Sequence, residues 1–174
     1  MADAPDGIVL ARDRDLRGRK NDIWFRRGLL TLVGIVPVLA LFNLFGQHPD
    51  TIKASTGAAS LTVYAPSKIR GGLLFEARFH IVAHRELKNA VLVLDSGWLE
   101  GTTVNTIEPS PTNEASKNGN LSLVLGHIPA HHSFILFMQF QVNPTNVGHR
   151  SAGVQLWDGN SRLLTVHRAV TSYP

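Results

Sequence analysis

Two patterns of hydrophobic and polar residues divide the chain. From Gly28 to Gly46, nineteen consecutive residues carry no charge and most are apolar. From Ser60 onward, short runs of β-branched, leucine and aromatic residues are separated by Gly, Pro and Asn, with no convincing helical period. The first pattern is typical of a helix that crosses a membrane, and the second is typical of β-strands.

The apolar stretch has the length of a membrane-spanning helix. Nineteen helical residues at about 1.5 Å each extend roughly 28 Å, which matches a hydrocarbon core of about 30 Å. A cleavable signal peptide has a shorter apolar region, of about 7 to 15 residues, followed closely by small residues. Here the nearest small-residue cluster, Ala54 to Ala59, comes late. We therefore expect a transmembrane helix over 28–46, bounded by Gly28 and Gly46, and a linker over 47–57.

Cleavage is the alternative interpretation of the same segment. Arg26 and Arg27 are followed directly by Gly-Leu-Leu, which resembles a twin-arginine export signal, although Phe25 stands where that motif prefers a small polar residue. The sequence leaves open whether the arginine pair directs export.

The distribution of basic residues predicts the orientation of the helix. Residues 1–27 contain seven Lys or Arg and five Asp or Glu, whereas Lys53 is the one basic residue in the twenty positions after the span. Basic residues flanking a span favour the cytoplasmic side. We therefore expect residues 1–27 to form a solvated cytoplasmic tail, with the C-terminal domain outside the cytoplasmic membrane.

Two residues inside the predicted span interrupt its apolar character. Pro37 removes one backbone donor and can kink the helix, and Asn43 places an amide near the outer end. Both fit a tolerated kink and an amide that reaches the interface. A contact with another membrane helix is the alternative, although no small-xxx-small motif supports it.

The remainder of the chain, 58–174, has the pattern of one all-β domain. The turn signal Asp158 to Asn160 predicts a final hairpin, and Glu108 to Asn120 reads as one long polar loop. Seven or eight strands in this length predict an antiparallel β-sandwich. The predicted strands lie near 60–65, 73–83, 89–95, 98–107, 120–126, 133–142, 152–157 and 162–171.

Three local motifs resemble those of immunoglobulin-like domains of bacterial surface proteins. The first predicted strand ends at Pro66, the second opens after Gly71 and Gly72, and a Gly-His-Ile-Pro-Ala turn at 126–130 leads into a long strand. His131 follows that turn, where the class usually has Gly. The resemblance covers roughly residues 58–172 and implies an immunoglobulin-like fold that adheres, spaces or scaffolds, without catalytic residues. The chain is also similar to bacterial proteins built from a short basic tail, one span and one β domain.

Composition excludes several classes of chemistry. The chain has no cysteine, which excludes disulfides, thiol catalysis and cysteine metal sites. Its net charge of +4 is small and is not concentrated in one segment, so we expect no nucleic-acid partner. The familiar signatures of hydrolases, nucleotide-binding proteins and zinc peptidases are absent from the sequence. We expect no enzymatic activity and no cofactor.

Histidines offer one candidate for metal chemistry. His127, His131 and His132 fall around one predicted turn, and imidazole is a common ligand of zinc and copper. Turn histidines usually sit in water, and no carboxylate lies close in sequence, so we predict no metal there while the question stays open. Period-two geometry places His80 and His84 on the solvent face of their strand.

Two further features invite an enzymatic or sugar-binding interpretation. Glu100 and Glu108 could be proposed as an acid pair for glycoside hydrolysis, although one sequence cannot fix their separation. A carbohydrate-binding module would show aligned exposed aromatic rings. The candidate rings are Tyr64, Trp98, Trp157 and Tyr173, of which Trp98 fits the core better.

The strongest candidate for an interaction surface lies in the segment 133–142. Its even positions form an unbroken apolar series from Phe134 to Val142, which period-two geometry assigns to the core. The odd positions then face outward and include Ile135 and Phe137. Trp157 points outward by the same alternation, so pairing of the two strands would join Ile135, Phe137 and Trp157 in one patch.

These observations favour a membrane-anchored, non-enzymatic accessory protein. It would be tethered to the lipid bilayer by one helix and would present its β-domain to a membrane-protein partner or another envelope component. A cell-wall or carbohydrate-binding module is the alternative, and a metal-binding protein or metal-dependent enzyme is a lesser one.

Overall fold

The computed structural model describes residues 20–42, 47–117 and 119–174. The chain divides into two compact units, 1–46 and 47–174, and each is described by itself.

The first unit contains helix α1, Lys20–Leu41. Its segment Asn21–Leu41 is long and apolar enough to cross a membrane, and no residue of its most apolar part is buried. The helix includes Gly28 and Pro37, whereas Asn43 and Gly46 lie outside the described residues. It begins eight residues before the predicted span, so the end of the predicted tail is helical as well. There the Arg27 guanidinium lies 5.6 Å from the centre of the Trp24 ring.

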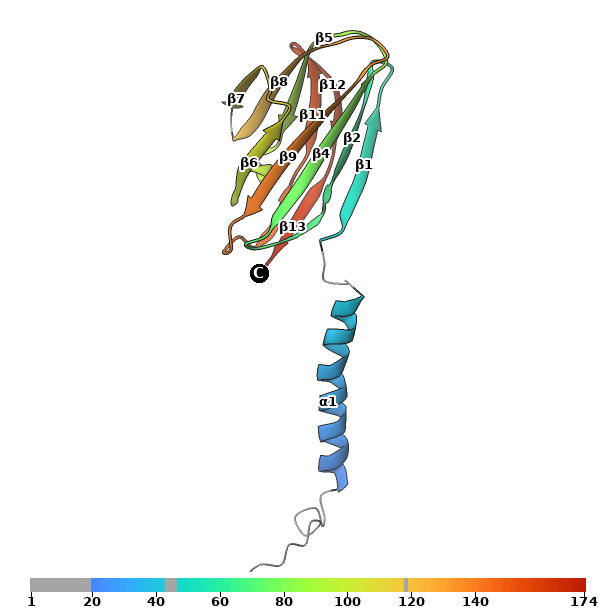
Figure 1. Ribbon diagram of the computed structural model, residues 1–174, viewed down its shortest axis with the longest axis vertical. Helices are drawn as coiled ribbons and strands as arrows, with labels where there is room; N and C mark the ends of the chain where they lie inside the picture. Colours follow the sequence, from blue (N-terminus) through green and yellow to red (C-terminus); the bar gives the residue numbers. More distant parts are fainter. Residues whose placement is uncertain (1–19, 43–46, 118) are drawn as a thin grey trace, which may run out of the picture. The chain divides into compact units, whose positions relative to one another are not determined.

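The second unit is a β-sandwich, as predicted (Figure 1). One five-stranded sheet has the order β1-β2-β4-β9-β6, and the other has the order β12-β11-β5-β8-β7. A small third sheet, β10-β13-β3, includes a parallel pairing of β13 with β3, whereas the strands of the two large sheets pair antiparallel. The strands are β1 (Pro49–Ser55), β2 (Ala59–Pro66), β3 (Lys68–Arg70), β4 (Leu74–Ala83), β5 (Leu87–Leu94), β6 (Thr102–Glu108), β7 (Asn113–Lys117), β8 (Asn120–Ile128), β9 (Ser133–Val142), β10 (Gly148–Ser151), β11 (Val154–Asp158), β12 (Ser161–Val166) and β13 (Ala169–Tyr173).

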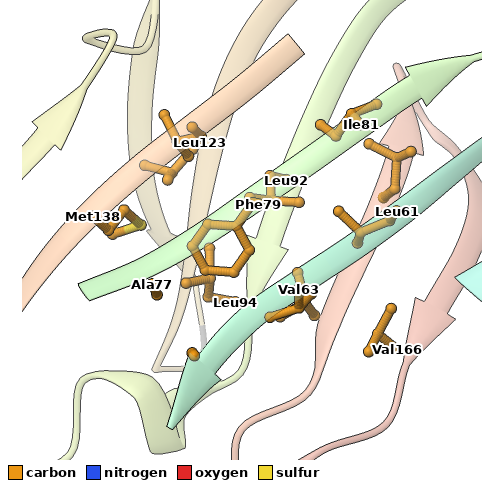
Figure 2. Close-up of a cluster of buried hydrophobic side chains, with 14 of the residues drawn as sticks. Leu61, Val63, Ala77, Phe79, Ile81, Leu92, Leu94, Leu123, Met138 and Val166 are labelled. Carbon is orange, nitrogen blue, oxygen red and sulfur yellow. The ribbon is translucent and has the colours of Figure 1, made fainter. Parts of the chain in front are cut away.

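The core lies between the two large sheets. Apolar side chains alternate inward along β4 and β9, where Phe79, Leu136 and Phe140 are fully buried and Phe134 is partly buried against the core. Figure 2 shows Leu61, Phe79 and Met138 of one sheet close to Leu92 and Leu123 of the other. The predicted inward and outward faces of both strands are therefore confirmed, except that His84 lies beyond the end of β4, in the loop before β5.

The predicted linker over 47–57 is wrong, because most of it belongs to the sandwich. Residues Pro49–Ser55 form β1, which pairs with β2 from Pro49↔Pro66 to Ser55↔Ser60. Ile52 and Ala54 pack against the core, so this segment has the alternation of an edge strand. The folded unit accordingly begins at residue 47 instead of 58.

Three other predicted boundaries differ from the structure. The strand expected from Trp98 begins at Thr102, because Ser96–Trp98 forms a short 3-10 helix, η2. The predicted polar loop contains β7, which pairs with β8. The predicted last strand is two strands, β12 and β13, separated at His167 and Arg168, where the arginine turns into the interior. The expected hairpin at Asp158 is present between β11 and β12.

Arg168 is the charged residue among the buried side chains of the described residues, with 7% of its surface exposed. Its guanidinium donates to the carbonyls of Ala65, at 2.8 Å, and Pro66. It also lies 5.1 Å from the centre of the Trp98 ring. Burial lowers the pKa of Arg168 to about 10, against an opposing effect of Asp50. At neutral pH the side chain is therefore a buried cation that links β2 to the end of β12.

The turn between β8 and β9 contains His131, which stands where the immunoglobulin-like class usually has Gly. His131 has φ 63°, the left-handed region that glycine adopts most easily. The backbone thus has the glycine-like conformation at the position where immunoglobulin-like domains usually have Gly, although the side chain differs.

Candidate functional site

The outer face of the sheet that contains β4 carries the most distinctive side-chain arrangement. Cross-strand pairing aligns Tyr64 on β2 with Arg78 on β4, and Arg78 with Phe137 on β9. Phe137 comes from a strand that is far from the other two in sequence. The three residues form one row because each is on the outward phase of its own strand.

Arg78 lies between the two aromatic rings. Its guanidinium carbon is 5.4 Å from the centre of the Tyr64 ring and 5.1 Å from the centre of the Phe137 ring. Its Nη2 donates to Glu76 Oε1 at 3.4 Å. A cation over an aromatic face is stabilised by about 0.5 to 1 kcal/mol at an exposed site. Two rings and one carboxylate therefore restrict an otherwise flexible arginine.

Ile135 extends this row along β9. It lies opposite His80, one outward position from Phe137. Ile135 is 39% exposed, Phe137 38% and Tyr64 37%, on a sheet face where polar side chains are the norm. We name the set Tyr64, Glu76, Arg78, Ile135 and Phe137 the Arg78 face.

The predicted patch is therefore only partly present. Ile135 and Phe137 face outward, as the alternation predicts. Trp157 does not join them, because β9 and β11 belong to different sheets. Trp157 instead lies half-buried beside Val91 of β5, and its Nε1 donates to Gln155 Oε1 at 3.1 Å. The pairing on which a joint patch of Ile135, Phe137 and Trp157 depended is therefore not present.

The Arg78 face suits recognition better than a chemical reaction. It offers an arginine that contacts the carboxylate of Glu76, with apolar surface on either side. Sequence reasoning missed Arg78 and considered Tyr64 only as a sugar-binding ring. The available signal was the outward phase of both residues, but the order of the strands was needed to bring them together.

Among the other candidate residues, Trp98 and Glu100 lie apart from this face, whereas Glu108 stands opposite Phe137 at its edge. Trp98 is buried beside Phe79 and Phe140, with ring centres 5.4 Å and 5.5 Å away, as the core assignment predicted. Glu100 precedes β6 and Glu108 ends it. That strand is roughly 20 Å long at about 3.3 Å per residue. Glycoside hydrolysis requires two carboxylates about 5 to 9.5 Å apart. Two groups at opposite ends of β6 are too far apart to meet this requirement.

In the turn that contains His127, His131 and His132, one histidine contacts a carboxylate that the sequence did not suggest. His127 Nε2 lies 2.9 Å from Glu86 Oε1, and His132 Nδ1 lies 3.0 Å from its neighbouring carbonyl at Ala130. Among the described residues, no group of three or more histidine or acidic side chains is arranged to hold a metal ion.

No protein-family model matches this chain, and no curated protein sequence matches it. The CARDB domain of the PF1109 protein from Pyrococcus furiosus, in complex with di-metal ions, is 12% identical with a TM-score of 0.40, over 73% of this chain and 90% of that chain. The C-terminal domain of Wzt is 11% identical with a TM-score of 0.42, and the match covers 74% of this chain and 81% of that chain. The FixG-related protein from Vibrio parahaemolyticus is 12% identical with a TM-score of 0.39, and the match covers 68% of this chain and 100% of that chain. Likeness at this level says nothing of function, which is argued from the chain's own residues.

Proposed function

We propose that this chain is a non-enzymatic accessory protein anchored in the cytoplasmic membrane by α1. Its sandwich lies outside the membrane and presents the Arg78 face to a membrane protein or another protein of the envelope. The observation that carries the proposal is the group of exposed Tyr64, Ile135 and Phe137 side chains around Arg78. Aromatic and arginine side chains dominate the binding energy of many protein interfaces.

The anchor and its orientation rest on α1 and its flanks. Asn21–Leu41 is exposed and apolar, which is costly in water and favourable in lipid. Seven basic residues lie in 1–27, before most of the apolar stretch, and Lys53 follows it. Trp24 and Arg27 lie together near the start of the helix, where an aromatic ring and a cation suit the membrane interface. These features favour a retained helix with a cytoplasmic N-terminus.

The rings of the Arg78 face favour a protein partner over a sugar. A sugar-binding platform needs an open ring face on which a pyranose can stack. Here the guanidinium covers one face of both Tyr64 and Phe137. An arginine held between rings has lost part of its side-chain entropy before binding, which lowers the cost of ordering it at an interface. Carbohydrate binding remains the alternative because Tyr64 and Tyr173 are exposed.

Affinity capture of the full-length protein from gently solubilised membranes tests the interaction. The variant Ile135→Ser with Phe137→Ser should lose its co-purifying membrane partner, by about tenfold or more, because two apolar side chains leave the centre of the surface. The matched control is Gln139→Ser with Gln141→Ser, which changes two outward side chains of the same strand and should retain the partner.

Three results would contradict the proposal. Unfolding of the double variant would assign Ile135 and Phe137 to the core. Equal loss in the glutamine control would make the effect non-specific. If the purified protein bound a glycan and no protein partner co-purified with it, the carbohydrate alternative would be favoured. The anchor is tested separately by an alkaline wash, after which the protein should stay in the membrane with its N-terminal residues intact; release of a shortened form would overturn that part.

A further inference from the structure

The large apolar side chains exposed on the sandwich fall into two groups. One group belongs to the Arg78 face. The other consists of Leu73, Leu74, Val147 and Tyr173, each of which is 47% to 59% exposed. We name these four residues the apolar end. Single exposed apolar residues are ordinary on a protein surface, whereas a group of them marks a surface that meets something other than water.

Val147 and Tyr173 lie side by side in the small third sheet. Val147 directly precedes β10, and Tyr173 is the last residue of β13. The pairing Gly148↔Ser172 places these two residues next to each other at the same edge of the sheet. Two of the four apolar side chains therefore come from one strand pair.

Leu73 and Leu74 join this pair from the start of β4. The Gly71 amide donates to the Tyr173 carbonyl at 2.8 Å, and the Val142 amide donates to the Leu73 carbonyl at 3.0 Å. These bonds tie the segment before β4 to the end of β13 and to the end of β9. The apolar end is thus carried on hydrogen-bonded backbone from distant parts of the sequence.

The apolar end is located where the chain enters the sandwich. β1 begins at Pro49, which is paired with Pro66 of β2. β2 continues through Ser67 into β3, whose last residue, Arg70, pairs with Tyr173. Figure 1 shows the start of β1 and the end of β13 at the same end of the sandwich.

The covalent chain limits how far this end can lie from α1. Seven residues, 42–48, separate Leu41, the last residue of α1, from Pro49. A fully extended chain covers at most about 3.6 Å per residue, so Pro49 stays within roughly 29 Å of Leu41 in any arrangement of the two units. With α1 in a bilayer, as proposed above, the apolar end is always within reach of the lipid surface.

The chemistry of this end favours lipid as the occupant. Leucine and valine side chains gain free energy when they leave water, and tyrosine is enriched where hydrocarbon meets the headgroups. The charges around the apolar end balance, so they give no preference for an anionic or a cationic partner. They are Lys68, Arg70 and Arg150 against Asp50, Glu76 and Glu100.

We propose that the apolar end inserts into the interface of the lipid bilayer that holds α1. This inference rests on the proposed anchor and adds a second attachment to it. Because the short connection holds the two attachments close together, weak insertion is sufficient. Insertion restricts the orientations of the sandwich at the membrane, which lowers the entropy cost of presenting the Arg78 face to a partner.

A spin label in the full-length protein tests the surroundings of the apolar end. The chain has no cysteine, so Thr145→Cys gives one attachment point for a nitroxide. Thr145 is exposed, and it follows Pro144, whose carbonyl oxygen lies against Gly71. The labelled protein is reconstituted in vesicles of phosphatidylcholine, which has no net charge. Collisions of the label with oxygen, which concentrates in lipid, are compared with collisions with a polar nickel chelate, which stays in water.

We expect the label at position 145 to give a ratio of oxygen to chelate collisions several-fold above that of the reference label. The reference is Asn160→Cys, an exposed position in the turn between β11 and β12, where β11 lies beside the start of β5. High salt screens surface charges and should leave the ratio at position 145 unchanged, because apolar burial supplies the attraction.

Substitutions assign the ratio to the apolar end. Leu73→Ser and Leu74→Ser with Val147→Ser, in the labelled protein, should lower the ratio at position 145 to the reference value. The melting temperature should stay nearly constant, because all three side chains are exposed. The matched control, Ile135→Ser with Phe137→Ser, removes exposed apolar side chains from the Arg78 face and should keep the lipid-like ratio.

Four results would overturn the proposal. The first is a water-like ratio at position 145 before any apolar residue is replaced. The second is unfolding of the triple serine variant, which would assign these side chains to the core. The third is loss of the lipid-like ratio at high salt, which would make charge the attraction. The fourth is rare collision with both reagents, which would show that protein, such as a second copy of this chain, covers the apolar end.

A label in α1 separates this inference from the anchor on which it rests. Val36→Cys lies in the exposed apolar part of the helix and should give a lipid-like ratio. A lipid-like ratio at position 36 with a water-like ratio at position 145 would overturn the insertion alone. A water-like ratio at position 36 would overturn the anchor and the insertion together.

Discussion

Replacing Arg168 with alanine tests how a buried cation contributes to this fold. The substitution removes the donor to the carbonyls of Ala65 and Pro66 and the cation beside the Trp98 ring. Each buried acceptor left without a donor costs about 1 to 3 kcal/mol, and a desolvated cation–π contact is worth about 2 kcal/mol. These losses sum to roughly 4 to 8 kcal/mol, and water entering the space left behind favours the lower end.

One gain opposes the loss. Burial lowers the pKa of Arg168 by more than two units, to about 10, from its ordinary, higher value. At 1.36 kcal/mol per tenfold change in acidity, burial disfavours the charged form by about 3 kcal/mol, and alanine removes this penalty. The side chain's Nε has no hydrogen-bond partner among the described residues, so it adds to the penalty. The net expectation is a loss of about 2 kcal/mol, or about 8 °C in melting temperature.

The assay is thermal and urea unfolding of the full-length protein in mild detergent, followed by the β-sheet circular dichroism signal. Arg162→Ala is the matched control, because Arg162 is an exposed arginine on the adjacent β12 and its loss should change stability by less than about 0.5 kcal/mol. If Arg168→Ala is as stable as the wild type, the two carbonyl contacts do not stabilise the fold and the reasoning fails.

The sign of the pH dependence gives a second readout. Because the pKa of Arg168 is lower in the folded protein, the unfolded chain binds more protons from about pH 10 up to the higher pKa of an exposed arginine. The stability advantage of wild type over Arg168→Ala should therefore increase with pH in this range, by about 1.4 kcal/mol between pH 9 and pH 11. A constant or falling difference would contradict the direction of the pKa change.

Two other predictions follow from corrected features of the fold. His131→Gly should raise the unfolding free energy by about 0.5 to 1 kcal/mol, because a side chain at φ 63° is strained. The control His132→Gly should not raise it. If His131→Gly lowered the unfolding free energy instead, contacts of the His131 side chain would outweigh the strain. Removal of residues 1–46 should leave a folded β unit. Removal of residues 1–57 also deletes β1 and exposes the edge of β2, so this fragment should melt several degrees lower. Equal melting temperatures of the two fragments would show that β1 is dispensable.

The sequence predicted the parts of the fold that depend on local periodicity. The faces of β4 and β9 follow from strict alternation, and the hairpin at Gly159 follows from a turn that needs a positive φ. β1 was missed because its alternation is carried only by Ile52 and Ala54, within a polar segment that resembles a linker. Arg168 was missed because a lone arginine in a strand pattern is usually exposed, and only tertiary contacts show where it points.

The interaction surface shows where periodicity stops being informative. Alternation assigns Arg78 and Phe137 to the outward faces of their strands, but a slip of two residues between β4 and β9 would preserve every inward and outward assignment. After such a slip, Glu76 or His80 would stand opposite Phe137 in place of Arg78. The observed pairing, Arg78↔Phe137, is set by the hydrogen-bond ladder and by the order of strands in the sheet. Sequence periodicity could therefore predict that Ile135 and Phe137 face outward, while the arginine between two rings could be found only once the register was known.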